Sequence, residues 1–203
     1  LEINPNNALL RSAYAHLLLI LKRDEEAMKQ ADLALELDPL NPMVLSFYAI
    51  VTASIGEYEK AIEVGEKAYS IAPEHGVAHH AMAIAYVYKG DYRSALNSWI
   101  NEFYLDENTR QLIMDTYDKE GYKMAAQLLA REAEKSELIY STGVGILYVI
   151  AENDSLAVDF FEQAYEEKDA NLPYIGRSMF LDGPFKIDDP RFYELLNKMN
   201  LPL

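Results

Sequence analysis

Three histidines, His75, His79 and His80, are the residues whose types and spacing come nearest to a metal site. Two histidines four residues apart on a helix can present their ring nitrogens on one side, as zinc ligands do. However, His75 falls in an expected loop, and no cysteine or nearby carboxylate completes a ligand set. We therefore expect neither a metal ion nor another cofactor.

Adjacent acidic residues occur near the ends of expected helices, at Glu25 and Glu26, Glu57 and Glu59, and Glu166 and Glu167. General acid–base catalysis needs a carboxyl group that is desolvated in a cleft, whereas these read as exposed. Those near helix starts also suit the helix dipole. The glycine pair Gly143 and Gly145 follows no strand, so a phosphate-binding loop is not indicated and close helix contact is. We expect no catalytic residue and no enzyme activity.

The elements that would position these side chains recur along the chain every 34 residues. A proline ends a similar phrase at Pro5, Pro39 and Pro73, as in Leu-Glu-Ile-Asn-Pro and Leu-Glu-Leu-Asp-Pro. The same interval separates alanines in two further sets, which are Ala15, Ala49 and Ala83, and Ala27, Ala61 and Ala95. Several positions repeating in one register indicate a repeat architecture.

Each 34-residue unit has the pattern of two helices. The first helices are expected near residues 8–21, 42–55 and 76–89, and the second near 24–37, 58–71 and 92–105. Gly56 and Gly90 fall at the turns between them, where a residue without Cβ can adopt positive φ. Lys22 holds that place in the first unit. Pro39 and Pro73 follow the second helices of the first two units, because a missing N–H ends a helix at little cost, whereas the third unit lacks this proline.

The repeated alanines predict where the two helices of a unit touch. Antiparallel helices approach most closely where neither carries a bulky side chain, so Ala49 should face Ala61, and likewise in the other units. Because one hairpin cannot cover its own apolar faces, stability should come from stacking on neighbours.

These residues resemble the tetratricopeptide repeat (TPR) family, most closely in the second unit, which has Tyr48-Ala49, Gly56-Glu57-Tyr58, Ala61, Ala68 and Pro73. The third unit departs at Glu102, where the family usually has alanine, and a local loosening of the solenoid would explain it. The resemblance implies an all-α, right-handed superhelical solenoid of antiparallel helix hairpins.

The repeat implies a solenoid over residues 1–171, with units at about 8–41, 42–75, 76–107, a degenerate 108–137, and 138–171. In the degenerate unit we expect two helices within Thr109–Ser136, broken near Glu120 and Gly121, the first of them shortened. Residues 172–203 should form a loop and a capping helix, Arg191–Met199, with Asp189 as N-cap and Pro190 in the first turn.

Composition excludes several function classes. Half of the 203 residues are hydrophobic, so a substantial core is expected rather than disorder. The net charge of −15 disfavours nucleic acid and anionic membranes as direct partners. The acidity either solvates an outer face or steers a basic partner. No cysteine is present, and the apolar runs are too short to cross a bilayer, which needs about 20 residues.

In the TPR family, first helices line a concave groove that binds extended peptides or helices. Spacings of three and four residues then predict the groove residues Ser12, His16, Leu19, Phe47, Ile50, Ser54, His80, Ile84, Tyr88 and Ile146. The set includes no permanently charged cation, so the Lys/Asn/Arg clamp that some family members use for chaperone carboxyl termini is not implied. An apolar groove suits an amphipathic helix or hydrophobic peptide. The alternative is that these residues only pack against the next helix or a further domain.

The resulting functional prediction is a non-enzymatic scaffold that binds a protein or peptide, most simply in the cytoplasm. The alternative is a regulatory region of a larger bacterial signalling protein, including an exported region of a membrane-anchored regulator. The tail from Asp188 to Pro202 is similar to the ends of bacterial proteins in which TPRs follow a nucleotide cyclase or winged-helix regulator. Residues 1–5 match the last turn of a second helix, so we also expect at least one repeat upstream, with further domains possible there.

Overall fold

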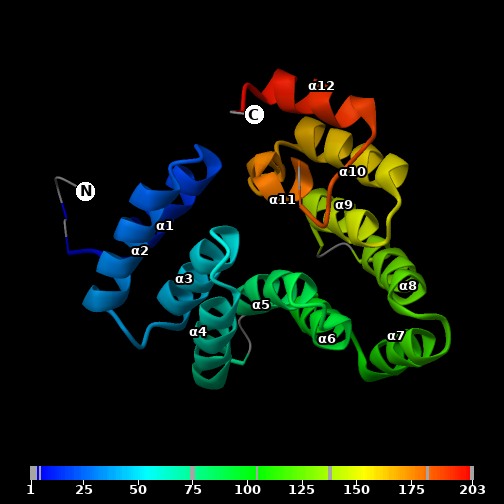
Figure 1. Cartoon of the computed structure of the whole chain (residues 1–203), viewed down its shortest axis with the longest axis horizontal. Coiled ribbons are helices and arrows are strands. Elements are labelled where there is room, and N and C mark those ends of the chain that lie inside the picture. The colour runs from blue at the N-terminus through cyan, green and yellow to red at the C-terminus, as the bar shows by residue number, and fades with distance from the viewer. Residues whose placement is uncertain are drawn as a thin grey trace. The chain divides into compact units, whose positions relative to one another are not determined.

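A computed structural model describes residues 4, 6–73, 76–103, 105–136, 139–181 and 183–201, without the side chains of Ser178 and Met179. Every regular element in these ranges is a helix. The chain divides into two compact units, Leu1–Tyr104 and Leu105–Leu203 (Figure 1). The predicted last turn at residues 1–5 lies almost wholly outside the described residues.

The first unit consists of three antiparallel helix hairpins: α1 (Ala8–Ile20) with α2 (Asp24–Leu37), α3 (Pro42–Ser54) with α4 (Tyr58–Ile71), and α5 (Val77–Tyr88) with α6 (Tyr92–Glu102). Helix α3 packs on both α1 and α2, and α5 packs on both α3 and α4. This is the stacking that the repeat predicts, and each helix begins and ends within three residues of the expected positions. The all-α solenoid class is therefore confirmed.

The repeated alanines are buried in all three hairpins of the first unit, as close approach of the paired helices requires. All six of them are at most 1% exposed. Glycine makes a similar contact between hairpins, because a Cβ on Gly65 of α4 would lie 2.6 Å from Cγ of Met82 in α5. Small side chains thus set the helix spacing both within a hairpin and between successive hairpins.

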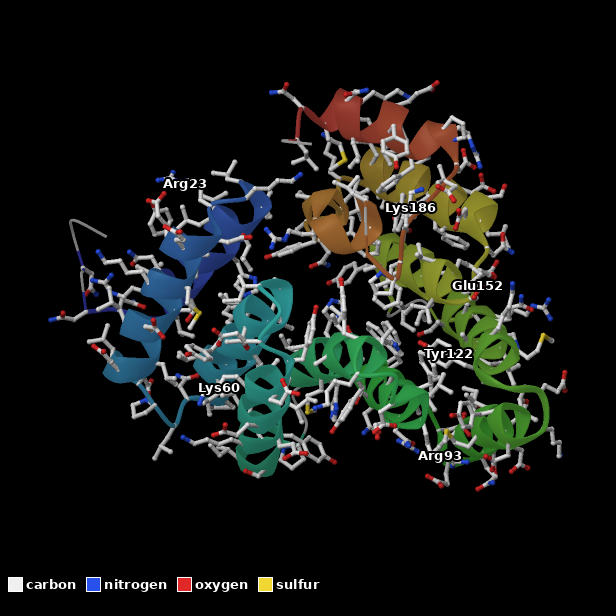
Figure 2. The ribbon with its side chains drawn as sticks, viewed as in Figure 1. Arg23, Lys60, Arg93, Tyr122, Glu152 and Lys186 are labelled. Atoms are coloured by element: carbon white, nitrogen blue, oxygen red, sulfur yellow. The ribbon has the colours of Figure 1, made fainter. Side chains whose placement is uncertain are left out.

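The turns within hairpins adopt the left-handed conformation expected of them. Gly56 and Gly90 have φ of +91° and +74°, and Lys22 adopts +57° in the first hairpin. Arg23, next to Lys22, forms an ion pair of 2.6 Å with Glu26 in the first turn of α2 (Figure 2). The turn at Lys22, which has no glycine, is therefore followed by an ion pair in the first turn of α2.

The second unit begins with α7 (Glu107–Glu120) and α8 (Tyr122–Glu134), joined at Gly121 as expected. The prediction that the first helix is shortened was wrong, because α7 has 14 residues. Asp106 caps it early by accepting hydrogen bonds from the backbone N–H groups of Asn108 and Thr109, at 2.9 and 3.1 Å. Only Ile113 of α7 is buried, so the pattern of apolar residues underestimates the length of this helix.

The rest of this unit comprises α9 (Ser141–Ile150), α10 (Asp154–Glu167), the 3₁₀ helix η1 (Leu172–Gly176), α11 (Ser178–Leu181) and α12 (Pro190–Met199). Helices α9 and α10 pack as a hairpin. A Cβ on Gly145 would lie 2.5 Å from the ring of Phe161, so this glycine permits close contact of α9 with α10, as expected.

Helix α12 packs on α10, which agrees with the predicted capping helix. Asp189 accepts a hydrogen bond from the backbone N–H of Arg191 at 3.0 Å, as an N-cap does. Phe192 is fully buried, and its ring centroid lies 6.2 Å from that of Phe161. Arg191 also reaches Asp159 of α10 at 2.6 Å. The outer side of α10 is thus covered by an element that is not itself a repeat.

We predict that Ala61→Leu lowers the free energy of unfolding by about 1–3 kcal/mol, because the alanine contact has no room for three more carbons. Urea denaturation measures the change. The control is Glu63→Leu on the same helix, where the side chain is 72% exposed and overpacking cannot occur. Equal stability of the two variants would contradict the predicted close contact.

Candidate functional site

The first helices of the first unit form the candidate site. Helix α1 contacts α3, and α3 contacts α5, so side chains from the three helices can share one surface. Nine of the ten predicted groove residues lie on these helices. The tenth, Ile146, is a half-buried residue of α9 in the second unit, so neither unit by itself brings it to the other nine.

The nine residues in the first unit fall into two groups by depth. Ser12, His16, Leu19 and Ile84 are at most 8% exposed, so neighbouring helices already occupy most of their contact surface. The others are half-buried and offer surface to solvent: Phe47, Ile50, Ser54, His80 and Tyr88. We name these five residues the first-helix face.

His16 is held neutral beneath the first-helix face. Its ring centroid lies 4.4 Å from that of Phe47, and its Nε2 lies 3.4 Å from the carbonyl oxygen of the same residue. Burial lowers the pKa of His16 to about 4, more than the carbonyl contact can offset. The equivalent positions in the next two repeats are Ile50 and Ile84, so an uncharged imidazole here serves the packing role of isoleucine.

His80 is charged more readily because it pairs with Glu102. Its Nδ1 donates to Oε1 of Glu102 at 3.1 Å, and its ring meets that of Trp99 edge-on at 5.3 Å. Burial alone would lower the pKa of His80, but the charge of Glu102 and this hydrogen bond together raise it above its usual value. The first-helix face therefore carries the imidazole of His80 together with the carboxylate of Glu102 that balances its positive charge.

The pair also accounts for Glu102, the departure from the repeat pattern. Positions 34 residues earlier hold Ser46 and Ala68, and the first repeat has Ser12 and Ala34. The third repeat thus replaces a serine–alanine combination with histidine and glutamate, which hydrogen-bond to each other. Sequence reasoning missed this contact, although comparing the two positions together across the repeats would have suggested it.

Tyr88 is fixed at the other end of α5 by a second aromatic ring. It stacks on Tyr58 of α4 with centroids 4.5 Å apart and planes 17° from parallel. Burial, with the neighbouring Tyr58, raises the pKa of Tyr88 to about 12, so its hydroxyl stays protonated. Tyr58 was not among the predicted residues, and it orients one that was.

The first helices that the structure describes in regular hairpins carry little charge. Helices α3, α5 and α9 contain no Asp, Glu, Lys or Arg, and α1 contains Arg11 alone. The acidic residues are concentrated instead on second helices, such as α2 and α10. The first-helix face is therefore apolar and aromatic, with two histidines within or beneath it.

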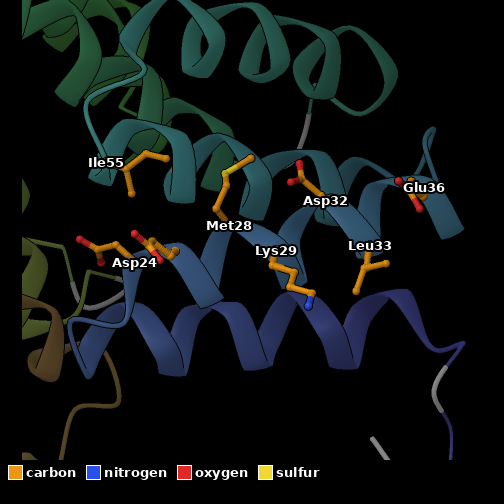
Figure 3. Close-up of a pocket in the computed structure, with 8 residues that line it drawn as sticks. Asp24, Met28, Lys29, Asp32, Leu33, Glu36 and Ile55 are labelled. Carbon is orange, nitrogen blue, oxygen red and sulfur yellow. The ribbon is translucent and has the colours of Figure 1, made fainter.

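A different hollow of about 600 Å³ lies along α2 (Figure 3). Its lining combines acidic residues with Lys29 and three apolar side chains, and comprises Asp24, Glu25, Met28, Lys29, Asp32, Leu33, Glu36 and Ile55. Asp32 accepts a hydrogen bond from the hydroxyl of Tyr48 at 3.1 Å, and burial and this acid raise the pKa of that tyrosine. Asp32 of this lining therefore lies against a tyrosine hydroxyl that stays protonated.

The histidines considered as metal ligands do not converge where the structure describes them. The ring of His79 meets Tyr69 of α4 at 4.7 Å, whereas His80 pairs with Glu102 of α6, and His75 lies outside the described residues. Among the described residues, no group of three or more His, Cys, Asp or Glu side chains could hold a metal ion. Within the same ranges, none of the helices has the length and apolar character needed to cross a membrane.

Comparison with solved structures relates this geometry to known proteins. The TPR protein TTC0263 of Thermus thermophilus matches with a TM-score of 0.56 and 18% identity, over 94% of this chain and 99% of its own. A TPR protein of Parabacteroides merdae matches with a TM-score of 0.49 and 18% identity, over 96% of this chain and 84% of its own. YrrB, described as a TPR protein with an unusual peptide-binding site, matches at 0.48 and 22%, over 85% and 93%. The first of these supports a TPR-type fold for this chain.

The sequence comparisons give no further relationship. The chain matches no family model and no curated protein. The similarity to TPR proteins is therefore one of fold, carried by hairpin geometry at low identity.

We predict that His16 makes stability fall as the solution is acidified. The unfolded chain binds the proton with a pKa of 6.5 and the folded chain with about 4, so protonation below pH 6.5 favours unfolding. Between pH 7.5 and 5 this group should remove about 2 kcal/mol of unfolding free energy. His16→Ile, which copies the next repeats, should lack that loss. If both proteins lost the same amount in urea titrations at the two pH values, the buried neutral histidine would be refuted.

We predict that His80 and Glu102 are energetically coupled by about 1–2 kcal/mol. His80→Ser leaves a carboxylate unpaired, whereas the double variant with Glu102→Ala restores the combination of the other repeats and should recover stability. Because the folded pKa of His80 is raised, the coupling should be complete below pH 6.5 and shrink as pH rises through the folded pKa. A double-mutant cycle by urea denaturation measures it, and additive single effects at low pH would argue against the pair.

Proposed function

We propose that the chain is a non-enzymatic scaffold that binds a protein segment on the first-helix face, Phe47, Ile50, Ser54, His80 and Tyr88. The observation that carries the proposal is the partial exposure of these residues on helices α3 and α5, which pack against each other. Apolar and aromatic side chains that remain open on a folded surface are the usual anchors of a protein interface.

The chemistry of the face favours an apolar partner. Since α3 and α5 carry no Asp, Glu, Lys or Arg, the partner gains little from charge and much from burying Phe47 and Ile50. An amphipathic helix or a hydrophobic extended peptide supplies such a surface. Ser54 and the His80–Glu102 pair can accept or donate individual hydrogen bonds at its border, which would fix the register of the bound segment.

The buried members of the predicted set support the site from below. Ser12, His16, Leu19 and Ile84 are buried and need not touch the partner, and His16 packs against Phe47 of the face. Ile146 belongs to the proposal only as a prediction from the repeat. The absence of enzyme activity and a cytoplasmic location are likewise parts of the proposal. The alternative of a regulatory region in a larger bacterial signalling protein continues to rest on the wording of the tail.

We predict that a fluorescent 16-residue amphipathic peptide, with Leu and Phe on one face and Gln and Ser on the other, binds saturably to the chain. Ile50→Asp should weaken this binding by about 10–100-fold, since it places a charge at the centre of the apolar contact. Fluorescence anisotropy measures the dissociation constant. Ile84→Asp is not a suitable probe, because the side chain is buried and the variant would lose stability.

The matched control is Leu40→Asp, which makes the same kind of change at a side chain that is 65% exposed between α2 and α3. It should leave the affinity within about twofold, because Leu40 lies on no first helix. Binding should also change little between 50 and 300 mM salt. Unchanged affinity in Ile50→Asp, or loss of binding in high salt, would exclude an apolar contact at the first-helix face.

A further inference from the structure

The hollow along α2 combines an apolar floor with an open, charged rim. The floor consists of Met28 and Leu33 of α2 and of Ile55 at the end of α3, all three of them half-buried. Because α3 supplies Ile55, the hollow lies on the side of α2 that faces the following repeat. Asp24 lies at the same end as Ile55, and Glu36 lies at the other end (Figure 3). From Asp24 to Glu36 the helix rises about 18 Å.

The rim of the hollow is strongly acidic. Its lining contains four carboxylates and the ammonium group of Lys29, so its net charge is −3. Three of the carboxylates belong to exposed side chains, which are Glu25, Asp32 and Glu36. The whole chain carries a net charge of −15, so long-range attraction also favours the approach of a basic group. An apolar floor beside these carboxylates strengthens their attraction for a cation that is partly removed from water.

The second repeat shows which cation fits the equivalent position. There, Nζ of Lys89, just after α5, donates to Oε1 of Glu59 in α4 at 2.6 Å. The residues 34 positions earlier are Ile55 and Glu25. The first repeat therefore keeps the carboxylate but has isoleucine in place of the lysine that binds it. A lysine or arginine from another protein can supply the missing ammonium or guanidinium group to Glu25.

The second repeat also shows which apolar group fits beside the cation. The rings of Tyr58 and Tyr88 stack there with their centroids 4.5 Å apart. The residues 34 positions earlier are Asp24 and Ser54, whose side chains are much smaller. The space that two tyrosine rings fill in the second repeat is therefore not filled by the equivalent side chains of the first. An aromatic side chain next to the incoming cation suits this space.

The spacing of the lining residues favours an extended occupant. Residues four apart on one side of α2 are separated by about 6 Å along the helix, and alternate side chains of an extended chain by about 6.8 Å. An extended segment that lies along α2 can therefore place every second side chain in the hollow. Basic side chains suit its two ends, near Glu25 and Glu36. Apolar side chains suit the middle, because Lys29 repels a cation there and Met28 and Leu33 provide an apolar surface.

We propose that the hollow along α2 binds a short extended segment of a partner protein, with basic side chains at both ends and aromatic or aliphatic side chains between them. The basic side chains pair with Glu25 and Glu36, and the apolar ones cover Met28, Leu33 and Ile55. This site shares no residue with the first-helix face. It also selects a different chemistry, because its affinity depends on charge.

Fluorescence anisotropy with the labelled peptide Lys-Ser-Tyr-Ser-Leu-Ser-Arg, blocked at both ends, tests the proposal on the 203-residue chain. We expect a dissociation constant on the order of 100 µM in 50 mM salt, and binding at least fivefold weaker in 300 mM salt. Glu25→Lys with Glu36→Lys should weaken binding at least tenfold. The control, Glu120→Lys with Glu166→Lys, makes the same change in net charge at two exposed acids of the second unit and should keep the affinity within about twofold. Circular dichroism checks that all variants fold.

Two further measurements locate the bound peptide. Ile55→Lys introduces the lysine of the second repeat, which should pair with Glu25 and lower the affinity for the peptide at least fivefold, whereas Ile55→Leu should leave it unchanged. In methyl NMR spectra, the resonance of Met28 should shift on titration with the same dissociation constant. The resonance of Met124, a side chain of the second unit that is 41% exposed, should not shift.

Several results would overturn the proposal. An equal loss of affinity in the hollow and control charge variants would show a general attraction between the peptide and an acidic chain. No binding at 1 mM chain, or an unmoved Met28 resonance in the bound state, would exclude the hollow as the site. Ile50→Asp on the first-helix face should leave this affinity unchanged, so the two binding surfaces are tested separately.

Discussion

The packing of a first helix on the hairpin before it, as α3 packs on α1 and α2 and α5 on α3 and α4, is the interaction on which the rest of the first unit depends. A hairpin buries the alanines between its own two helices, but its outer apolar surface stays exposed to solvent until another hairpin packs on it. Helix α5, which packs on both α3 and α4, buries eight of its 12 residues.

Close stacking also forces side chains to change in matched sets. Gly65 exists beside Met82 because a Cβ there would collide with the methionine, and Gly145 stands in the same relation to Phe161. The exchange of serine and alanine for His80 and Glu102 follows the same rule with polar groups, since either residue alone would leave a poorly satisfied partner. At each of these positions, the residue on one helix is matched in size or polarity to the residue that it contacts on the neighbouring helix.

The periodic features of the fold could be predicted from the sequence because they follow from residue type at fixed spacing. Alanines, prolines and the turn at Gly90 located the hairpins of the first unit, and Asp189 located the start of α12. The length of α7 could not be predicted in this way. Asp106 caps the helix early, and its many charged residues leave too few apolar positions for a helical repeat to be recognised. For the candidate site, helical spacing placed nine of the ten predicted residues on α1, α3 and α5, but it could not separate buried Leu19 from half-buried Ile50, since burial depends on how the next hairpin packs. The pairing of His80 with Glu102 could be predicted only by comparing positions on α5 and α6 together.

The distribution of charge links the packing constraint to function. First helices that are covered on two sides cannot carry ionised side chains, because burying an unpaired charge costs more than any single packing contact returns. The acidic residues are therefore excluded from α3 and α5 and collect on second helices such as α2, where water solvates them. The same exclusion leaves the first-helix face, which remains partly open to solvent, without an ionised Asp, Glu, Lys or Arg side chain. The packing of hairpins therefore determines the chemistry of the surface on which we propose that a partner binds.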